Sequence, residues 1–235
     1  MRVMLVISYD GSKFYGFQRQ NNQLSVQGYL EELLTHELNE NIVIKGSGRT
    51  DRGVHAKYQV VHFETNKDVN NLKDKINKIA QNLHVKKLKV VSDDFHSRYD
   101  VKSKTYIYKI DLTKNRNSNY YLPISYKLNI KQMKKAAKLF IGTHDFRNFV
   151  AGKREDYVST VFNVRVFKIN NILYLKFIGK GFYRYMVRNL VGALIEIGKG
   201  KIDLNVIKDM LDNPDKEKRL TTVSPNGLYL TKIRY

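Results

Sequence analysis

The sequence GSGRTDRGVHA, residues 46–56, has a single carboxylate, Asp51, at its centre. Glycines at 46, 48 and 53 permit positive φ, so we expect a sharp turn that a bulky partner can approach closely. Arg49 and Arg52 flank Asp51, and a nearby guanidinium favours the ionised carboxylate that a nucleophile or a base needs. An ordinary Gly/Asp turn with a surface ion pair is the alternative interpretation of the same residues.

Predicted strands lie before and after this stretch, and together with two predicted helices they make up the first half of the chain. Residues 2–8 form a nearly continuous apolar run, which is typical of a strand buried on both faces. After Ser25, a favourable N-cap, apolar residues recur every three or four positions and predict an amphipathic helix. The predicted elements of this half, in order, are a strand at 2–8, a helix at 26–39, strands at 42–45 and 58–65, a helix at 72–83 and a strand at 88–91. This order is that of the ferredoxin-like split βαβ arrangement, which is widely used for RNA binding.

The second half shows a comparable set of strands and helices. Tyr106, Tyr108 and Ile110 alternate onto one face of a predicted strand. Asn129 is placed to cap a helix that ends at Gly142. The expected buried positions of that helix are Met133, Ala136, Ala137, Phe140 and Ile141.

A polar loop at 144–155 follows that helix. The other elements predicted in this half are strands at 105–112, 159–169, 172–178 and 228–233, and helices at 183–197 and 204–211. An Asn-rich hairpin turn joins the strands at 159–169 and 172–178. We therefore predict an α+β protein of two closely packed halves, residues 1–104 and 105–235.

The charge of the chain indicates a polyanionic partner. Among 235 residues, 42 Lys and Arg face 22 Asp and Glu, which gives a formal charge of +20. This excess is larger than the solubility of a small domain requires. Nucleic acid is the partner that fits, because 16 Tyr and 11 Phe supply faces on which unstacked bases can lie. Part of the lysine excess can also reflect an AT-rich genome, so the charge is supporting evidence only.

Other features bear on compartment and cofactors. The sequence has no cysteine, which excludes disulfides, thiolate nucleophiles and cysteine-based zinc sites. No stretch approaches the ~20 apolar residues of a spanning helix, and the first residues form a strand-like run rather than a signal peptide. We therefore expect a cytoplasmic protein with no membrane partner. The motifs for phosphate loops, dinucleotides and metal clusters are missing, so we expect no cofactor and no metal.

Residues 48–56 resemble the catalytic motif Gly-Arg-Thr-Asp-x-Gly-Val-His-Ala of the tRNA pseudouridine synthase A family at every fixed position. The agreement continues in the family's order along nearly all of the chain. It includes Tyr9–Ser12, Tyr15–Gln20, Ser25–Gln27, Val61–Phe63, Phe95–Arg98, Lys104–Tyr108, Met186–Gly192 and Gly227–Leu230. Phe17 and Tyr185 depart from the family pattern, in which tryptophan and histidine are common at these positions.

The resemblance implies a fold, a reaction and a set of site residues. The fold has two ferredoxin-like or RRM-like halves that share a continuous, mostly antiparallel sheet with helices on one face. The reaction is the isomerisation of uridine to pseudouridine at positions 38, 39 and 40 in the anticodon arm of tRNA, and the enzyme is a homodimer. The implied catalytic residues are Asp51 as nucleophile, Tyr106 stacked on the uracil, and Arg188 paired with Asp51. The implied substrate-binding residues are Arg49, Tyr106, Gln18, Arg19 and Arg98.

The reaction explains why one carboxylate is enough. It breaks the N1–C1′ bond of a uridine, rotates the uracil and rejoins it through C5, with no net gain or loss of atoms. The sequence leaves three roles open for Asp51 in this reaction: attack on C1′ of the ribose, attack on C6 of the base, or assistance to the departing uracil. Because a stacked base hides these atoms, the nucleotide must be flipped out of its helix.

Three other functions compete with this one. The first is a paralogous synthase that acts on another RNA, such as ribosomal RNA. The second is a non-catalytic RNA-binding module, which the joint presence of Asp51, Tyr106 and Arg188 disfavours. The third is a glycosidase or nucleoside hydrolase, which is disfavoured because the motifs offer one carboxylate where glycoside hydrolysis usually uses two.

Overall fold

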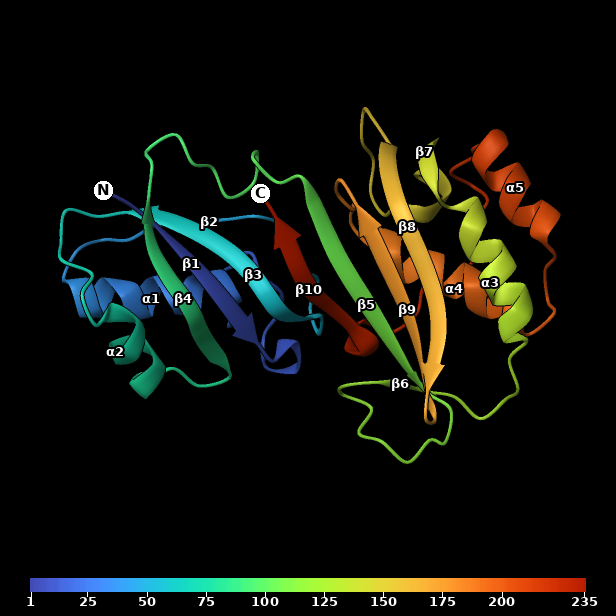
Figure 1. Cartoon of the computed structure of the whole chain (residues 1–235), viewed down its shortest axis with the longest axis horizontal. Helices are drawn as coiled ribbons and strands as arrows, with labels where there is room; N and C mark the ends of the chain where they lie inside the picture. The colour runs from blue at the N-terminus through green and yellow to red at the C-terminus, as the bar shows by residue number, and fades with distance from the viewer. The chain divides into compact units, whose positions relative to one another are not determined.

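The computed structural model describes residues 1–235 and consists of two compact units (Figure 1). The first unit comprises Met1–Lys102 together with Tyr229–Tyr235, and the second comprises Ser103–Leu228. The chain passes into the second unit after Lys102 and returns to the first at Tyr229. The last strand lies in the first unit, because its residues pair with a strand there.

The sheet of the first unit is built around β1 (Arg2–Tyr9). This strand lies between β3 (His55–Glu64) and β4 (Leu83–Val91) and is antiparallel to both. β2 (Lys45–Gly46) is also antiparallel to β3, whereas β10 (Leu228–Arg234) pairs in parallel with the first residues of β3. The order of strands and helices up to β4 is the ferredoxin-like order that the sequence predicts.

Two helices of the first unit, α1 (Val26–Leu38) and α2 (Leu72–Ile79), pack against each other, and α2 packs against β4. Ser25 caps α1 as predicted, since its side chain accepts a hydrogen bond from the N–H of Gly28. The helix that we predicted to reach residue 83 ends earlier, and Leu83 begins β4, where it is buried. The pairing of β4 with β1 shifts by one residue at Lys86, and this bulge interrupts the alternation of apolar and polar residues in the sequence.

The second unit has its own antiparallel sheet. Its strands, in spatial order, are β5 (Ser103–Asp111), β9 (Ile172–Gly179), β8 (Val158–Ile169) and β7 (Gly142–Asp145). β6 (Leu122–Pro123) pairs in parallel with the end of β5. The α+β class and the mostly antiparallel pairing that the sequence predicts are confirmed.

Three helices belong to this unit: α3 (Ile130–Leu139), α4 (Met186–Gly198) and α5 (Leu204–Asp212). α3 contacts α4, α5 and β8, and nearly every residue of α4 is buried. α4 begins later than the predicted Tyr183, because Tyr185 adopts a left-handed φ of 63°. No helix in the protein combines the length and the apolar character that crossing a membrane requires. Short 3₁₀ helices lie at Gly11–Lys13, Arg147–Phe149 and Pro225–Gly227.

Two predictions around the end of α3 are wrong. Ile141 is 39% exposed rather than buried, because α3 stops at Leu139 and the chain changes direction at Gly142, whose φ is +127°. His144 and Asp145 do not open a loop but complete β7, which pairs with the start of β8. The predicted cap is correct, since the side chain of Asn129 accepts a hydrogen bond from a backbone N–H in the first turn of α3.

Candidate active site

Residues 47–54, which we call the motif loop, connect β2 to β3 and include the half-buried Asp51. Of the three glycines in residues 46–56, only Gly53 has a positive φ, of 81°. Gly46 serves close packing instead, because a Cβ there would lie 2.4 Å from the ring of Phe17. The positive φ that the three glycines permit is therefore used only at Gly53.

Thr50 fixes the backbone immediately before Asp51. Its Oγ1 lies 2.8 Å from the hydroxyl of Tyr9 at the end of β1, and its carbonyl accepts a 3.0 Å hydrogen bond from the N–H of Phe17. The carbonyl of Asp51 accepts a 3.1 Å hydrogen bond from the N–H of Val54. Burial raises the pKa of Tyr9 above its usual value, so this hydroxyl stays a neutral hydrogen-bond partner.

Side chains of β3 anchor both ends of the loop. Gln59 is fully buried; its Oε1 accepts a 2.5 Å hydrogen bond from the Ser47 hydroxyl, and its Nε2 donates to the carbonyl of Gly48 at 2.9 Å. At the other end, the buried His55 ring stacks on Tyr229 of β10, with centroids 4.6 Å apart and planes 17° apart. A loop held at both ends keeps its carboxylate in one place.

The two arginines beside Asp51 are exposed and differ in their contacts. The guanidinium of Arg52 lies 4.1 Å from the ring centroid of Tyr15, which is a cation–π contact. Arg49 extends from the loop at the surface, where a large partner can reach it.

Gln18 and Arg19, which we expect to bind substrate, are exposed. Arg19 has a partner that the sequence did not reveal, because its guanidinium pairs with the buried carboxylate of Glu31 in α1. Glu31 also accepts a 2.9 Å hydrogen bond from the N–H of Ile44, just before β2. Arg19 is therefore tied to the helix and to the strand that leads into the motif loop. A carboxylate on the apolar face of a predicted helix was the signal that could have identified this contact.

Arg98, also expected to bind RNA, lies in a segment that is tied to β2. The hydroxyl of the preceding Ser97 donates a 2.7 Å hydrogen bond to the carbonyl of Lys45 and lies 2.8 Å from Nδ1 of His62. The Arg98 guanidinium lies 5.8 Å from the ring centroid of Tyr99, which is 75% exposed. The segment that carries Arg98 thus joins the strand from which the motif loop starts.

Tyr106 and Tyr108 face the same side of β5, as predicted, and the structure buries both. The ring of Tyr106 meets Phe182 edge to face, with centroids 5.4 Å apart and planes at 84°. The hydroxyl of Tyr108 donates a 2.7 Å hydrogen bond to the carbonyl of Ser224, and burial raises the pKa of this hydroxyl. Tyr108 is therefore a packing residue.

Arg188 lies in the first turn of α4, where two groups of the second unit contact it. Its Nε donates a 2.8 Å hydrogen bond to the carbonyl of Val223, and its guanidinium lies 4.4 Å from the ring centroid of Tyr185. The next carbonyl along the chain, that of Ser224, accepts the Tyr108 hydroxyl. Residues 223–224 thus link the helix that carries Arg188 to the strand that carries Tyr106.

The predicted site residues are divided between the two units. Asp51, Arg49, Gln18, Arg19 and Arg98 belong to the first unit, on or beside the motif loop and the strand that enters it. Tyr106 and Arg188 belong to the second. No group of three or more His, Cys, Asp or Glu side chains is arranged to hold a metal ion.

Comparisons with known proteins identify the family. The model of the family described as tRNA pseudouridine synthase matches residues 5–100 and 136–235. The chain is 38% identical to the tRNA pseudouridine synthase A of Pseudothermotoga lettingae, over 100% of this chain and 99% of that protein. It is 40% identical to that of Streptococcus agalactiae serotype Ia, over 97% and 93%, and 36% identical to that of Mycoplasmoides gallisepticum, over 99% and 90%. These matches define an isomerase class, the pseudouridine synthases. Within this class, the chain belongs to the tRNA pseudouridine synthase A family.

Proposed function

We propose that this chain isomerises uridine to pseudouridine in tRNA and that Asp51 is the nucleophile. The observation that carries the proposal is the similarity, over essentially the whole chain, to relatives named tRNA pseudouridine synthase A. The formal charge of +20 supports an RNA substrate, because phosphate contacts supply much of the affinity in protein–nucleic acid complexes.

The chemistry needs one carboxylate in a fixed position. Asp51 bonds to C1′ and displaces N1 of the uracil, or it adds to C6 and loosens the same N1–C1′ bond, or it assists departure of the base without bonding. In each course C5 loses its hydrogen when the C1′–C5 bond forms, and N1 gains one from solvent. The product therefore has the composition of the substrate.

The anchoring of the motif loop supports the role of Asp51. Thr50, the residue before it, shares a hydrogen bond with the Tyr9 hydroxyl and accepts one from the N–H of Phe17, and Gln59 holds the start of the loop. A nucleophile that is already in position does not have to be ordered during the reaction, which lowers the entropic part of the barrier.

We assign Tyr106 to stacking on the flipped uracil and Arg188 to an ion pair with Asp51. The contact with Phe182 supports the first assignment, because it orients the Tyr106 ring. The contacts with Val223 and Tyr185 support the second, because they restrict the guanidinium. A guanidinium beside a carboxylate lowers the pKa of the acid and so keeps it ionised for attack.

The substrate site within tRNA is also part of the proposal. We assign the reaction to uridines 38, 39 and 40 of the anticodon arm, with Arg49 filling the position that the flipped nucleotide leaves. Exposure of Gln18, Arg19 and Arg98 supports a role for them in RNA contacts. We further propose a homodimer in the cytoplasm, in which one subunit holds the body of the tRNA while the other modifies it.

The experiment measures tritium release from an unmodified tRNA transcript that contains 5-tritiated uridine. Asp51→Asn keeps the shape of the side chain but removes its charge and nucleophilicity. We expect the rate of release to fall by on the order of 10³-fold or more, while tRNA binding survives. Asp74→Asn on α2 is the matched control, because this carboxylate is exposed and pairs only with the neighbouring Lys73.

Two results would contradict the proposal. Release by Asp51→Asn at a rate close to that of the unaltered protein would exclude Asp51 as the nucleophile. Release from a transcript in which cytidine replaces uridines 38, 39 and 40, or from ribosomal RNA fragments alone, would indicate a synthase with another target.

A further inference from the structure

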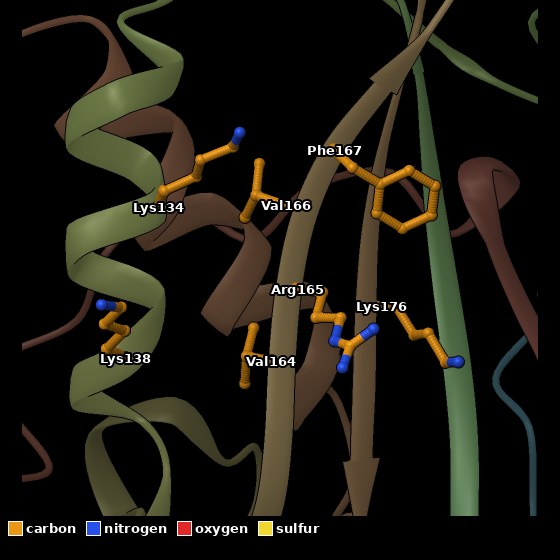
Figure 2. Close-up of a pocket in the computed structure, with 7 residues that line it drawn as sticks. All are labelled: Lys134, Lys138, Val164, Arg165, Val166, Phe167 and Lys176. Carbon is orange, nitrogen blue, oxygen red and sulfur yellow. The ribbon is translucent and has the colours of Figure 1, made fainter.

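A groove of about 500 Å³ lies in the second unit, between α3 and β8 (Figure 2). We call it the β8 groove. The residues that line it are Lys134, Lys138, Val164, Arg165, Val166, Phe167 and Lys176.

The groove exists because β8 has a free edge. β7 pairs with β8 only as far as Val161, so no strand covers the outer edge of the later residues. Side chains alternate along this part of β8. The buried Val164 and Val166 lie on the side of α3, whereas Arg165 and Phe167 lie over the sheet on the other side (Figure 2).

Four cations line the groove without a compensating acid. Lys134 and Lys138 are one turn apart on α3, and Arg165 of β8 lies directly opposite Lys176 of β9. No carboxylate lines the groove, and none of the four cations forms a salt bridge. Like charges at these spacings destabilise a helix or a sheet, so a bound anion would relieve the repulsion.

An aromatic pair continues the groove across the sheet. The rings of Phe167 and Tyr174 are stacked, with centroids 5.3 Å apart and planes 9° apart. Tyr174 in turn lies opposite Lys109 on β5, so a row of one cation and two aromatic rings crosses three strands. Cations with aromatic rings between them are the side chains that contact the phosphates and bases of nucleic acids.

We propose that the β8 groove binds the ribose–phosphate backbone of tRNA at nucleotides other than the reacting uridine. The proposal rests on the proposed function, which supplies the RNA. Within the second unit, β5 with Tyr106 is two strands away from β8, about 10 Å. Tyr106 also lies opposite Phe177 on the buried face, whereas Lys176 lies on the other face. One nucleotide therefore cannot stack on Tyr106 and occupy the groove.

The composition of the groove favours RNA over a peptide. A free strand edge above two valines would suit an added peptide strand on its own. Four cations that have no acid partner, together with Phe167 and Tyr174, match a chain of phosphates and bases instead.

The test uses two double variants on the same helix. Lys134→Ala/Lys138→Ala removes two charges from the groove, and Lys131→Ala/Lys135→Ala removes two exposed charges at the same spacing outside it. Alanine is a good helix former, so neither pair is expected to impair folding. For each protein, filter binding gives the Kd of an unmodified tRNA transcript over a series of salt concentrations, and tritium release gives the rate at saturating tRNA.

We expect weaker binding by the groove variant. The slope of log Kd against log salt should fall by about two, one for each lost phosphate contact, while the saturating rate stays unchanged. The control variant should keep the slope of the unaltered protein. Arg165→Ala/Lys176→Ala, from the other rim, should reproduce the loss.

Three outcomes would overturn the proposal. Equal slopes for the groove variant and the control would show that RNA does not occupy the groove. A lower saturating rate with unchanged Kd would place the groove in the chemistry, and a change of mass in light scattering would make it an interface between copies of the chain. Because binding is measured apart from tritium release, a missing release in all proteins would count against the reaction and not against the groove.

Discussion

Tyr106 and Tyr108, two residues apart on one face of β5, allow chemistry and stability to be separated. Tyr106→Phe keeps the ring and its contact with Phe182, so we expect tRNA affinity to be largely preserved. If the hydroxyl transfers a proton, tritium release should slow by about 10²- to 10⁴-fold. Tyr108→Phe leaves the Ser224 carbonyl without its donor, which should cost about 1–3 kcal/mol of unfolding free energy and leave the rate intact.

Urea unfolding and tritium release on both variants check this expectation. Slow release by Tyr106→Phe, together with lower stability but intact release for Tyr108→Phe, would agree with the assigned roles. The opposite pattern would exchange the roles of the two tyrosines.

His62 makes the stability of the first unit depend on pH. Burial, together with the charges of His96, Arg2 and Lys45, lowers the pKa of His62 from 6.5 to about 4. Between these values the unfolded chain takes up a proton that the folded protein excludes. The unfolding free energy should therefore fall as the pH is lowered from 6.5 towards 4.

Replacing His62 should weaken the dependence of the unfolding free energy on pH. We expect His62→Gln to lose less unfolding free energy than the unaltered protein over the same pH interval. Urea unfolding at several pH values measures the difference. Parallel curves for the two proteins would mean that His62 does not titrate as described.

At the scale of elements, Gly192 decides how closely α4 packs against residues 221–224. A Cβ at this position would lie 1.8 Å from the carbonyl oxygen of Thr221. Gly192→Ala should therefore displace this segment and with it the Val223 carbonyl that accepts the hydrogen bond from Arg188. We expect a loss of roughly 1–3 kcal/mol, a Tm lower by about 2–4 °C for each kcal/mol, and slower tritium release.

Gly181→Ala is the control for this change. No atom lies within 4 Å of a Cβ at Gly181, so a thermal melt should show an unchanged Tm. Equal melting temperatures for the two variants would mean that the backbone at Thr221 does not press against α4.

The sequence predicts well those elements whose limits are set by residues close by in the chain. α1 and α3 each begin at a side-chain cap that is visible in the sequence, Ser25 and Asn129. β7 and the pairing of β10 with β3 were not predictable in this way, because neither has a local cause: β7 pairs with β8 across residues 146–157, and β10 pairs with β3 across the whole second unit. Helix and strand limits near Tyr185 also escaped prediction, since its left-handed backbone has no glycine to mark it.

At the scale of the whole molecule, the proposed site residues have local sequence signals, whereas the residues that hold them in place do not. A contiguous motif predicts a catalytic role for Asp51, and further motifs predict roles for Tyr106 and Arg188. Their supports come from other elements: Tyr9 bonds to Thr50 across 41 positions, and Arg188 bonds to the Val223 carbonyl across 35. Backbone carbonyls leave no trace in residue type, so only the folded structure reveals such contacts.

β10 belongs to the first unit although the ribosome makes it after the whole second unit. All of Ser103–Leu228 is synthesised between β4 and the residues that complete the first sheet. Until Tyr229 has left the exit tunnel, His55 lacks the ring on which it stacks, and β3 lacks its parallel neighbour. At this end the N–H of Gly11 already donates a 3.1 Å hydrogen bond to Nδ1 of His55, and β10 completes the support only after the second unit has been translated. A chain that stops before Tyr229 would carry Asp51 on a loop that lacks one of its supports, so it should modify RNA more slowly than the protein with β10 in place.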